Sequence, residues 1–142
     1  MGIIKIILAV ILPLYAFCQA PFKTNLITIP VKDTTFLYYK VTTILKANGY
    51  RLEKSGINNK CITTEPKVIN EGITMNISVL IDSSGDLNVK GHTFIPNVGI
   101  SLIENLGMRG SPAQLCWKEM DKTARQMGKN VKYKTIYIDH GY

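Results

Sequence analysis

Residues 73–94 read ITMNISVLIDSSGDLNVKGHTF, and this stretch decides the fold. In residues 73–81 every second residue is apolar, which is the period of a strand with one buried face. Residues 82–86, DSSGD, are typical of a turn, because their glycine tolerates a positive φ and their aspartates bond to nearby backbone. Residues 87–94 resume the alternation. The stretch therefore predicts an antiparallel β-hairpin.

Two amphipathic helices and three shorter strands are expected around this hairpin. Asp33 is the expected N-cap of the first helix, which ends at Gly49 in a left-handed cap. Ser111 begins the second helix, with proline at the first helical position and a glutamine that would close a capping box, and Gly128 ends it. The remaining alternating stretches predict strands over residues 25–31, 60–65 and 130–138.

The predicted order of elements is β-α-β-β-β-α-β. We expect an α+β fold, in which a mostly antiparallel sheet of about 4–5 strands carries two helices on one face. The pattern over residues 26–93 resembles small secreted domains of Bacteroidota-type bacteria, some of which have a TATA-binding-protein-like arrangement of sheet and helices. Such domains carry no established catalytic residues, so the resemblance implies a fold and no activity.

Residues 1–20, MGIIKIILAVILPLYAFCQA, are typical of an export signal. Lys5 supplies the positive charge, an apolar run follows it, and Ala16, Cys18 and Ala20 are small enough for a signal peptidase. The apolar run is shorter than the roughly 20 residues of a transmembrane helix. The segment therefore predicts export to the periplasm or the medium.

We expect residues 1–18 to be the signal peptide and residues 19–142 to form a single α+β domain. Cleavage after residue 20 is the alternative, but Pro21 would then follow the cut and restrict the backbone there. Lipid attachment to Cys18 would anchor the protein to a membrane. The bulky Phe17 disfavours lipidation.

Two cysteines, Cys61 and Cys116, remain after the signal. Disulfides persist in an exported protein, and a bridge between these two would close a long loop. The alternative is two buried thiols that pack as small apolar groups. The sequence alone leaves both open, because two cysteines define no spacing pattern.

The chain is basic, with 17 Lys and Arg against 10 Asp and Glu and a net charge of +7. Such a charge favours contact with an acidic envelope protein, an anionic polymer or a membrane surface. Nucleic acid is a disfavoured partner, because the chain is expected to be exported and has no recognisable nucleic-acid motif. The candidate basic surface covers the second helix and the last strand: Lys118, Lys122, Arg125, Lys129, Lys132 and Lys134.

Residues 94–110 form an apolar connection that should not lie free in water. It either packs on the core of its own domain, with a short helix around residues 101–106, or forms a lip hinged at glycines over a ligand or partner site. The apolar residues of this candidate lip are Phe94, Ile95, Val98, Ile100, Leu102, Ile103, Leu106 and Met108.

No catalytic, metal or cofactor motif is present in the sequence. We therefore expect a non-enzymatic binding or accessory module of the cell envelope, with no cofactor. A secreted hydrolase is the first alternative, and it requires a pocket near residues 94–110 that gathers His92 or carboxylates. A basic protein associated with a membrane surface is the second alternative.

Overall fold

The computed structural model describes residues 23–54, 60–106 and 108–137 of the chain. The expected export signal, with its cleavage and lipidation positions, lies outside these ranges. The elements in chain order are β1 (Leu26–Ile29), α1 (Leu37–Ala47), β2 (Cys61–Thr63), β3 (Lys67–Asn70), β4 (Ile73–Ile81), β5 (Leu87–Ile95), β6 (Gly99–Leu102), α2 (Pro112–Met127) and β7 (Lys132–Lys134).

The predicted hairpin is confirmed as β4 and β5, which pair antiparallel from Thr74↔Phe94 to Ile81↔Leu87. Its turn has Gly85 at φ 90°. The Asp82 carboxylate accepts hydrogen bonds from the backbone N–H groups of Ser84 (2.9 Å) and Asp86 (3.0 Å). The Ser84 hydroxyl also donates to this carboxylate. Its bond has the largest effect, and together with the two backbone bonds it holds the pKa of the Asp82 carboxyl below its usual range.

The other strands complete one antiparallel sheet in the order β2-β4-β5-β1-β7, and the α+β class is confirmed. The sheet has seven strands rather than about 4–5, because β3 also pairs with β4 and β6 also pairs with β5. The strand predicted over residues 60–65 ends before Pro66. In the structure the chain continues past this proline as β3, which pairs with the same neighbour, β4, as β2 does. The order is therefore β-α-β-β-β-β-β-α-β.

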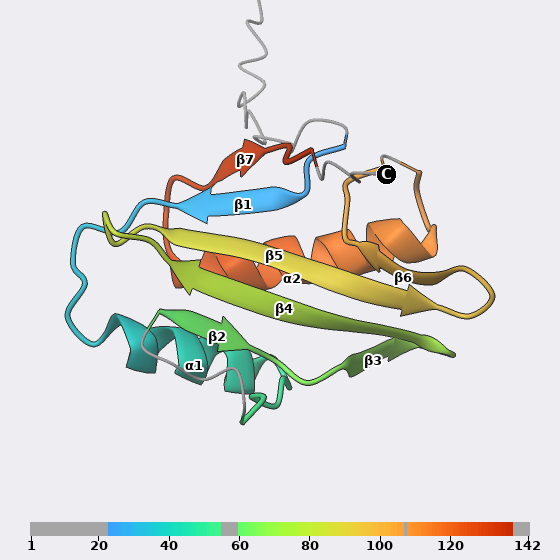
Figure 1. Cartoon of the computed structure of the whole chain (residues 1–142), viewed down its shortest axis with the longest axis horizontal. Helices are drawn as coiled ribbons and strands as arrows, with labels where there is room; N and C mark the ends of the chain where they lie inside the picture. Colours follow the sequence, from blue (N-terminus) through green and yellow to red (C-terminus); the bar gives the residue numbers. More distant parts are fainter. Residues whose placement is uncertain (1–22, 55–59, 107, 138–142) are drawn as a thin grey trace, which may run out of the picture.

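Both helices lie behind the sheet in the view of Figure 1. They pack against each other, and α2 packs against the buried side of β1, β4 and β5. This side of β4 presents Ile73, Met75, Ile77 and Val79, all buried. α2 supplies the opposing stripe of buried residues, which includes Cys116, Met120, Thr123, Ala124 and Met127. Among the described residues, no helix lies on the opposite face of the sheet, which we call the helix-free face.

The predicted helix ends are confirmed in part. Gly49 has φ 80°, and the Tyr50 N–H donates to the Leu45 carbonyl at 3.0 Å, which is the expected left-handed cap of α1. Asp33 is not the N-cap, because α1 begins after Phe36 and the Asp33 carboxylate accepts from the Thr35 N–H instead.

α2 begins as predicted, with the Ser111 hydroxyl accepting from the Gln114 N–H at 3.2 Å. The capping box is not closed, because the Ser111 N–H donates to the Met108 carbonyl and Oε1 of Gln114 has no hydrogen-bond partner. Gly128 ends the helix as predicted, in an extended conformation.

A disulfide between Cys61 and Cys116 is not formed. Cys116 is fully buried between α2 and the sheet, where its sulfur lies 3.3 Å from the Thr93 hydroxyl. On β2 the neighbouring Ile62 is the residue that points into the core, so the side chain of Cys61 lies on the helix-free face. The two cysteines are thus on opposite sides of the sheet.

Candidate functional site

The helix-free face is polar over most of the central hairpin and becomes apolar at one end. On β4, Thr74, Asn76 and Ser78 point to this face, since the residues between them are buried. At the end farthest from the 82–86 turn, the strand registers place Val68, Thr74, Phe94 and Ile100 in one row across β3, β4, β5 and β6. Three of these four side chains are apolar.

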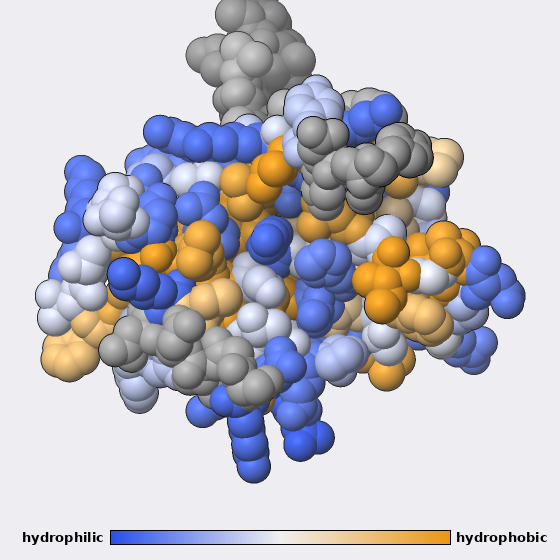
Figure 2. All heavy atoms as spheres, in the orientation of Figure 1, coloured by the Kyte–Doolittle hydropathy of each residue, from blue (hydrophilic) through white to orange (hydrophobic). Residues whose placement is uncertain are grey.

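We define the hairpin patch as Val68, Phe94, Val98 and Ile100. Their exposed fractions are 68%, 47%, 73% and 77%. Val98 lies in the turn between β5 and β6, next to Ile100. Figure 2 shows apolar atoms gathered over this end of the hairpin, on a face that is otherwise mixed. Large apolar side chains grouped in this way, and not singly, are typical of a surface that another molecule covers.

The candidate lip divides between the two faces. Phe94 and Ile95 end β5, and residues 99–102 form β6, a strand paired with β5. The short helix expected around residues 101–106 is therefore wrong. Ile103 is fully buried, and Ile95, Leu102 and Leu106 are half-buried, whereas Met108 is 63% exposed. Gly99, an expected hinge, begins β6 with φ 102°. Gly107 lies outside the described residues.

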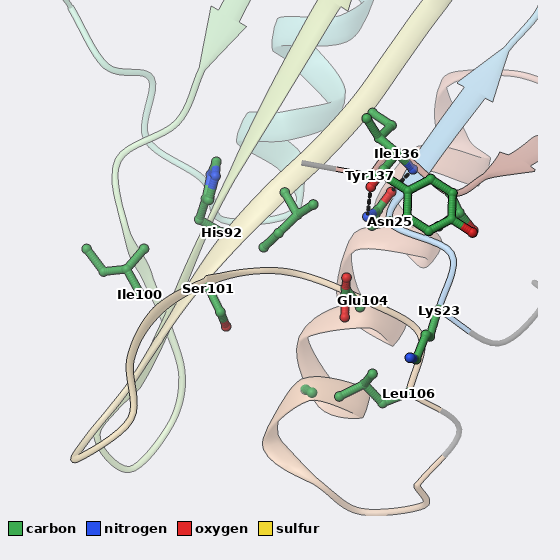
Figure 3. A pocket seen from close by; sticks show the side chains of 12 residues that line it. Lys23, Asn25, His92, Ile100, Ser101, Glu104, Leu106, Ile136 and Tyr137 are labelled. Atoms are coloured by element: carbon green, nitrogen blue, oxygen red, sulfur yellow. Dashed lines mark hydrogen bonds between the residues drawn. The ribbon is translucent and has the colours of Figure 1, made fainter. Parts of the chain in front are cut away.

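A pocket of about 730 Å³ lies beside β6 (Figure 3). Three consecutive residues of β6, residues 100–102, line one part of it, and residues 135–137, which follow β7, line another. Lys23, Asn25, His92, Glu104, Leu106 and Ala113 complete the lining. The pocket is therefore assembled from segments far apart in the sequence.

The Asn25 side chain holds this assembly together. Its amide donates to the Ile136 carbonyl at 2.8 Å and accepts from the Ile136 N–H at 2.7 Å, so it replaces a backbone partner just beyond the β1–β7 pairing. Figure 3 shows these bonds beside the Tyr137 ring. Asn25 is buried, and its two hydrogen bonds to Ile136 fix the path of residues 135–137.

His92 and Ser101, which both line the pocket, do not form a nucleophile–base pair. His92 is opposite Leu102 in the β5–β6 register, whereas Ser101 is opposite Thr93, whose side chain is on the helix-covered side. The His92 ring and the Ser101 hydroxyl accordingly point in opposite directions in Figure 3. Within the described ranges, no group of three His, Cys, Asp or Glu residues could hold a metal ion.

The candidate basic residues lie on two sides of the molecule. All six are exposed. Tyr133 packs towards α2, where its ring lies 6.1 Å from that of Trp117, so Lys132 and Lys134 on either side of it point to the helix-free face. Lys118 and Lys122 lie on the outer side of α2. The Arg125 guanidinium donates to the Asp121 carboxylate at 2.9 Å and also bonds to the Tyr133 hydroxyl.

A half-buried polar cluster between α1, β3 and α2 had no sequence signal. Lys67 Nζ lies 2.8 Å from the Glu119 carboxylate, 2.7 Å from the Asn48 carbonyl and 4.6 Å from the centre of the Tyr50 ring. Burial, and then the negative charge of Glu119, raise the pKa of the Tyr50 hydroxyl. Lys67 and Glu119 are adjacent only because β3 follows Pro66, so their sequence positions do not predict the contact.

Comparison with protein-family models finds no match, and comparison with curated proteins finds no significant one. Neither helix in the described part of the chain has the length and hydropathy of a membrane span.

Proposed function

We propose that this protein is an exported binding module of the cell envelope without catalytic activity of its own. The observation that carries the proposal is the hairpin patch. Val68, Phe94, Val98 and Ile100 are between 47% and 77% exposed, although the inner face of the central strands β4 and β5 is filled by buried side chains. Full burial of one such side chain contributes about 1.5–3 kcal/mol, so a partner that covers the patch gains several such increments.

The polar surroundings of the patch support a binding role over an aggregated state. Thr74, Asn76 and Ser78 of β4 keep the adjoining face wettable. A protein–protein contact commonly has an apolar centre and a polar rim, and this face offers that arrangement at one end of the sheet. The net charge of +7 falls only to +6 when Lys5 is removed with residues 1–18, and it adds long-range attraction to an acidic envelope partner.

Photocrosslinking tests the proposal directly. We would replace Val98 by a benzophenone amino acid and, as the matched control, replace the exposed Lys122 of α2 in the same way. Irradiation of intact cells that make the protein should give a discrete adduct from position 98 and none from position 122. The same product pattern from both positions would contradict the proposal.

Export is the second component of the proposal, and intact mass tests it. A protein whose sequence begins at Gln19 supports removal of residues 1–18 and release into the periplasm or the medium. A diacylglycerol-sized addition on Cys18 would replace this location with a lipid anchor. A mass that includes residues 1–18 would argue against cleavage.

A hydrolase remains the second candidate, because the pocket beside β6 gathers His92 and Glu104 with Lys23. A catalytic His92 would make hydrolysis of chromogenic ester or glycoside substrates fall by about 10²-fold or more in His92→Ala. If the protein is a binding module, the wild type should hydrolyse these substrates no faster than His92→Ala. Turnover abolished by His92→Ala and by Glu104→Gln, in protein that stays folded, would favour the hydrolase.

A further inference from the structure

We propose that the outer edge of β6 is a strand-addition site, where an extended peptide segment of a partner protein pairs with the sheet. The segment has apolar side chains at alternate positions and acidic residues beside them. This inference rests on the proposed binding function, because it specifies how the partner is held. Main-chain hydrogen bonds would supply affinity, and side-chain contacts on either side of the strand would supply selectivity.

The alternation of hydrogen-bonded and non-bonded pairs between β5 and β6 shows which backbone groups of β6 could bind a further strand. The Ile103 N–H donates to the Gly91 carbonyl at 2.9 Å. Because antiparallel strands alternate between bonded and non-bonded pairs, the Ile100 and Leu102 pairs are the non-bonded ones. Their N–H and C=O groups therefore point away from β5. Among the described residues β6 pairs with β5 alone, so no strand covers these groups.

The other sheet edges are protected in ways that β6 is not. Along β2 and just beyond it, the edge is partly covered by residues 51–53, through the bridge Leu52↔Thr64 and the bond from the Glu53 N–H to the Thr63 carbonyl. β3 has an irregular register, and β7 carries a lysine on each side of Tyr133. Bulges and lysines are the usual features that prevent strand addition. β6 reads GISL and has neither charge nor proline.

A pocket lies next to this edge. β1 and β6 lie end to end along the same edge of β5, and β7 lies on the far side of β1. A strand beside β6 would thus continue the line of β7. The pocket of about 730 Å³ occupies this position, with residues 100–102 on one side and residues 135–137 on another. A volume of this size is within the range of pockets that enclose a ligand.

The chemistry of the surroundings defines the segment. Ile100, Leu102 and Ile136 present apolar side chains to the pocket. The exposed Lys134 directly precedes the lining residue Thr135, and the exposed Lys90 lies two residues before His92 on β5. Both lysines point to the helix-free face, whereas the lining contains one acidic residue, Glu104. Apolar side chains at alternate positions would meet the first group, and acidic residues of the segment would meet the lysines.

Selection of short random peptides displayed on phage against the purified protein tests the site. Enriched sequences should alternate apolar and other residues and should contain Asp or Glu near an end. We would then measure the Kd of one enriched peptide, made synthetically, for the wild type and two variants. Leu102→Pro removes the outward N–H, and its proline is compatible with the extended residue before it. Leu102→Ala removes most of the side chain and keeps the N–H.

Leu102→Pro should weaken binding by about tenfold or more and Leu102→Ala by about threefold, because only the first leaves an acceptor of the peptide without its donor. A thermal melt would establish that both variants fold. A second measurement is independent of the variants: N-methylation along the peptide should abolish binding at every second position only, since alternate amides face β6.

Enrichment of no peptide, equal effects of the two variants in folded protein, or N-methyl sensitivity without a period of two would overturn strand addition. These results leave the proposed function standing if position 98 still gives its discrete crosslink. Loss of that crosslink with peptide binding intact would instead contradict the hairpin patch as the contact surface.

Discussion

The two faces of the sheet differ in what covers them and in how their side chains are used. On the helix-covered face, Ile77 and Val79 of β4 are fully buried against α1 and α2. On the other face, their neighbour Ser78 is half-buried, and Leu80 is 46% exposed. Packing of the core explains why the residues of the helix-covered face are apolar. The apolar residues at the β3–β6 end of the second face contribute little to the core, and this contrast indicates a role in binding.

The largest effect should come from truncating a large aliphatic side chain on each of the two faces. Ile77→Ala should lower the free energy of unfolding by about 2–5 kcal/mol, because it leaves a cavity in the core. Leu80→Ala, on the helix-free face, should lower it by about 1 kcal/mol or less. Urea denaturation of both variants measures the difference. Equal losses would mean that the outer face is covered within the folded protein itself.

Gly91 sharpens the comparison, because its missing side chain would point to the helix-covered face. A Cβ at this position would lie 2.5 Å from the Asn76 carbonyl oxygen and 2.8 Å from Cδ1 of Ile103. Gly91→Ala should therefore destabilise the protein by about 1–3 kcal/mol in the same assay. Lys90→Ala, on the opposite face, should change stability by about 0.5 kcal/mol or less. A neutral Gly91→Ala variant would refute the close packing of Ile103 on β5.

The polar cluster behind the sheet predicts a smaller, pH-dependent effect. Burial raises the pKa of the Tyr50 hydroxyl in the folded state, so above about pH 10 the unfolded chain loses this proton first and stability falls as pH rises. Tyr50→Phe should reduce the fall in the free energy of unfolding between about pH 10 and pH 11. Its effect on the free energy of unfolding near pH 7 should be smaller than this change in slope implies at high pH. The free energy of unfolding should be measured across this pH range for wild type and variant. Parallel curves would contradict the burial of Tyr50.

Local patterns predicted the parts of the fold that local physics determines. The alternation of residues 73–81, the turn glycine Gly85, the left-handed cap at Gly49 and the Ser111 N-cap each require only neighbouring residues, and the structure has all of them. β3 and β6 were missed for the opposite reason. They are four residues long, and each becomes a strand only because a longer neighbour, β4 or β5, supplies the hydrogen bonds.

The candidate site could be predicted only in outline. The composition of residues 94–110 predicted an apolar connection, but the division of its side chains between a buried Ile103 and an exposed Ile100 depends on strand register. The side on which Cys61 lies also depends on register, so the sequence left both the disulfide and the two free thiols open, and the structure has the free thiols. The pocket needs the Asn25–Ile136 bonds, which join residues 111 positions apart. No local pattern encodes such a contact.

The central claim is that the hairpin patch, and not the basic outer side of α2, holds the partner. The most direct measurement is size-exclusion chromatography of the native protein extracted from cells that make it, for wild type, Val98→Asp with Ile100→Asp, and Lys118→Glu with Lys122→Glu. All four positions are exposed, so the variants should fold. The account predicts that wild type and the lysine variant elute in a complex and that the hairpin variant elutes as free protein. A complex lost in the lysine variant and retained in the hairpin variant would contradict it.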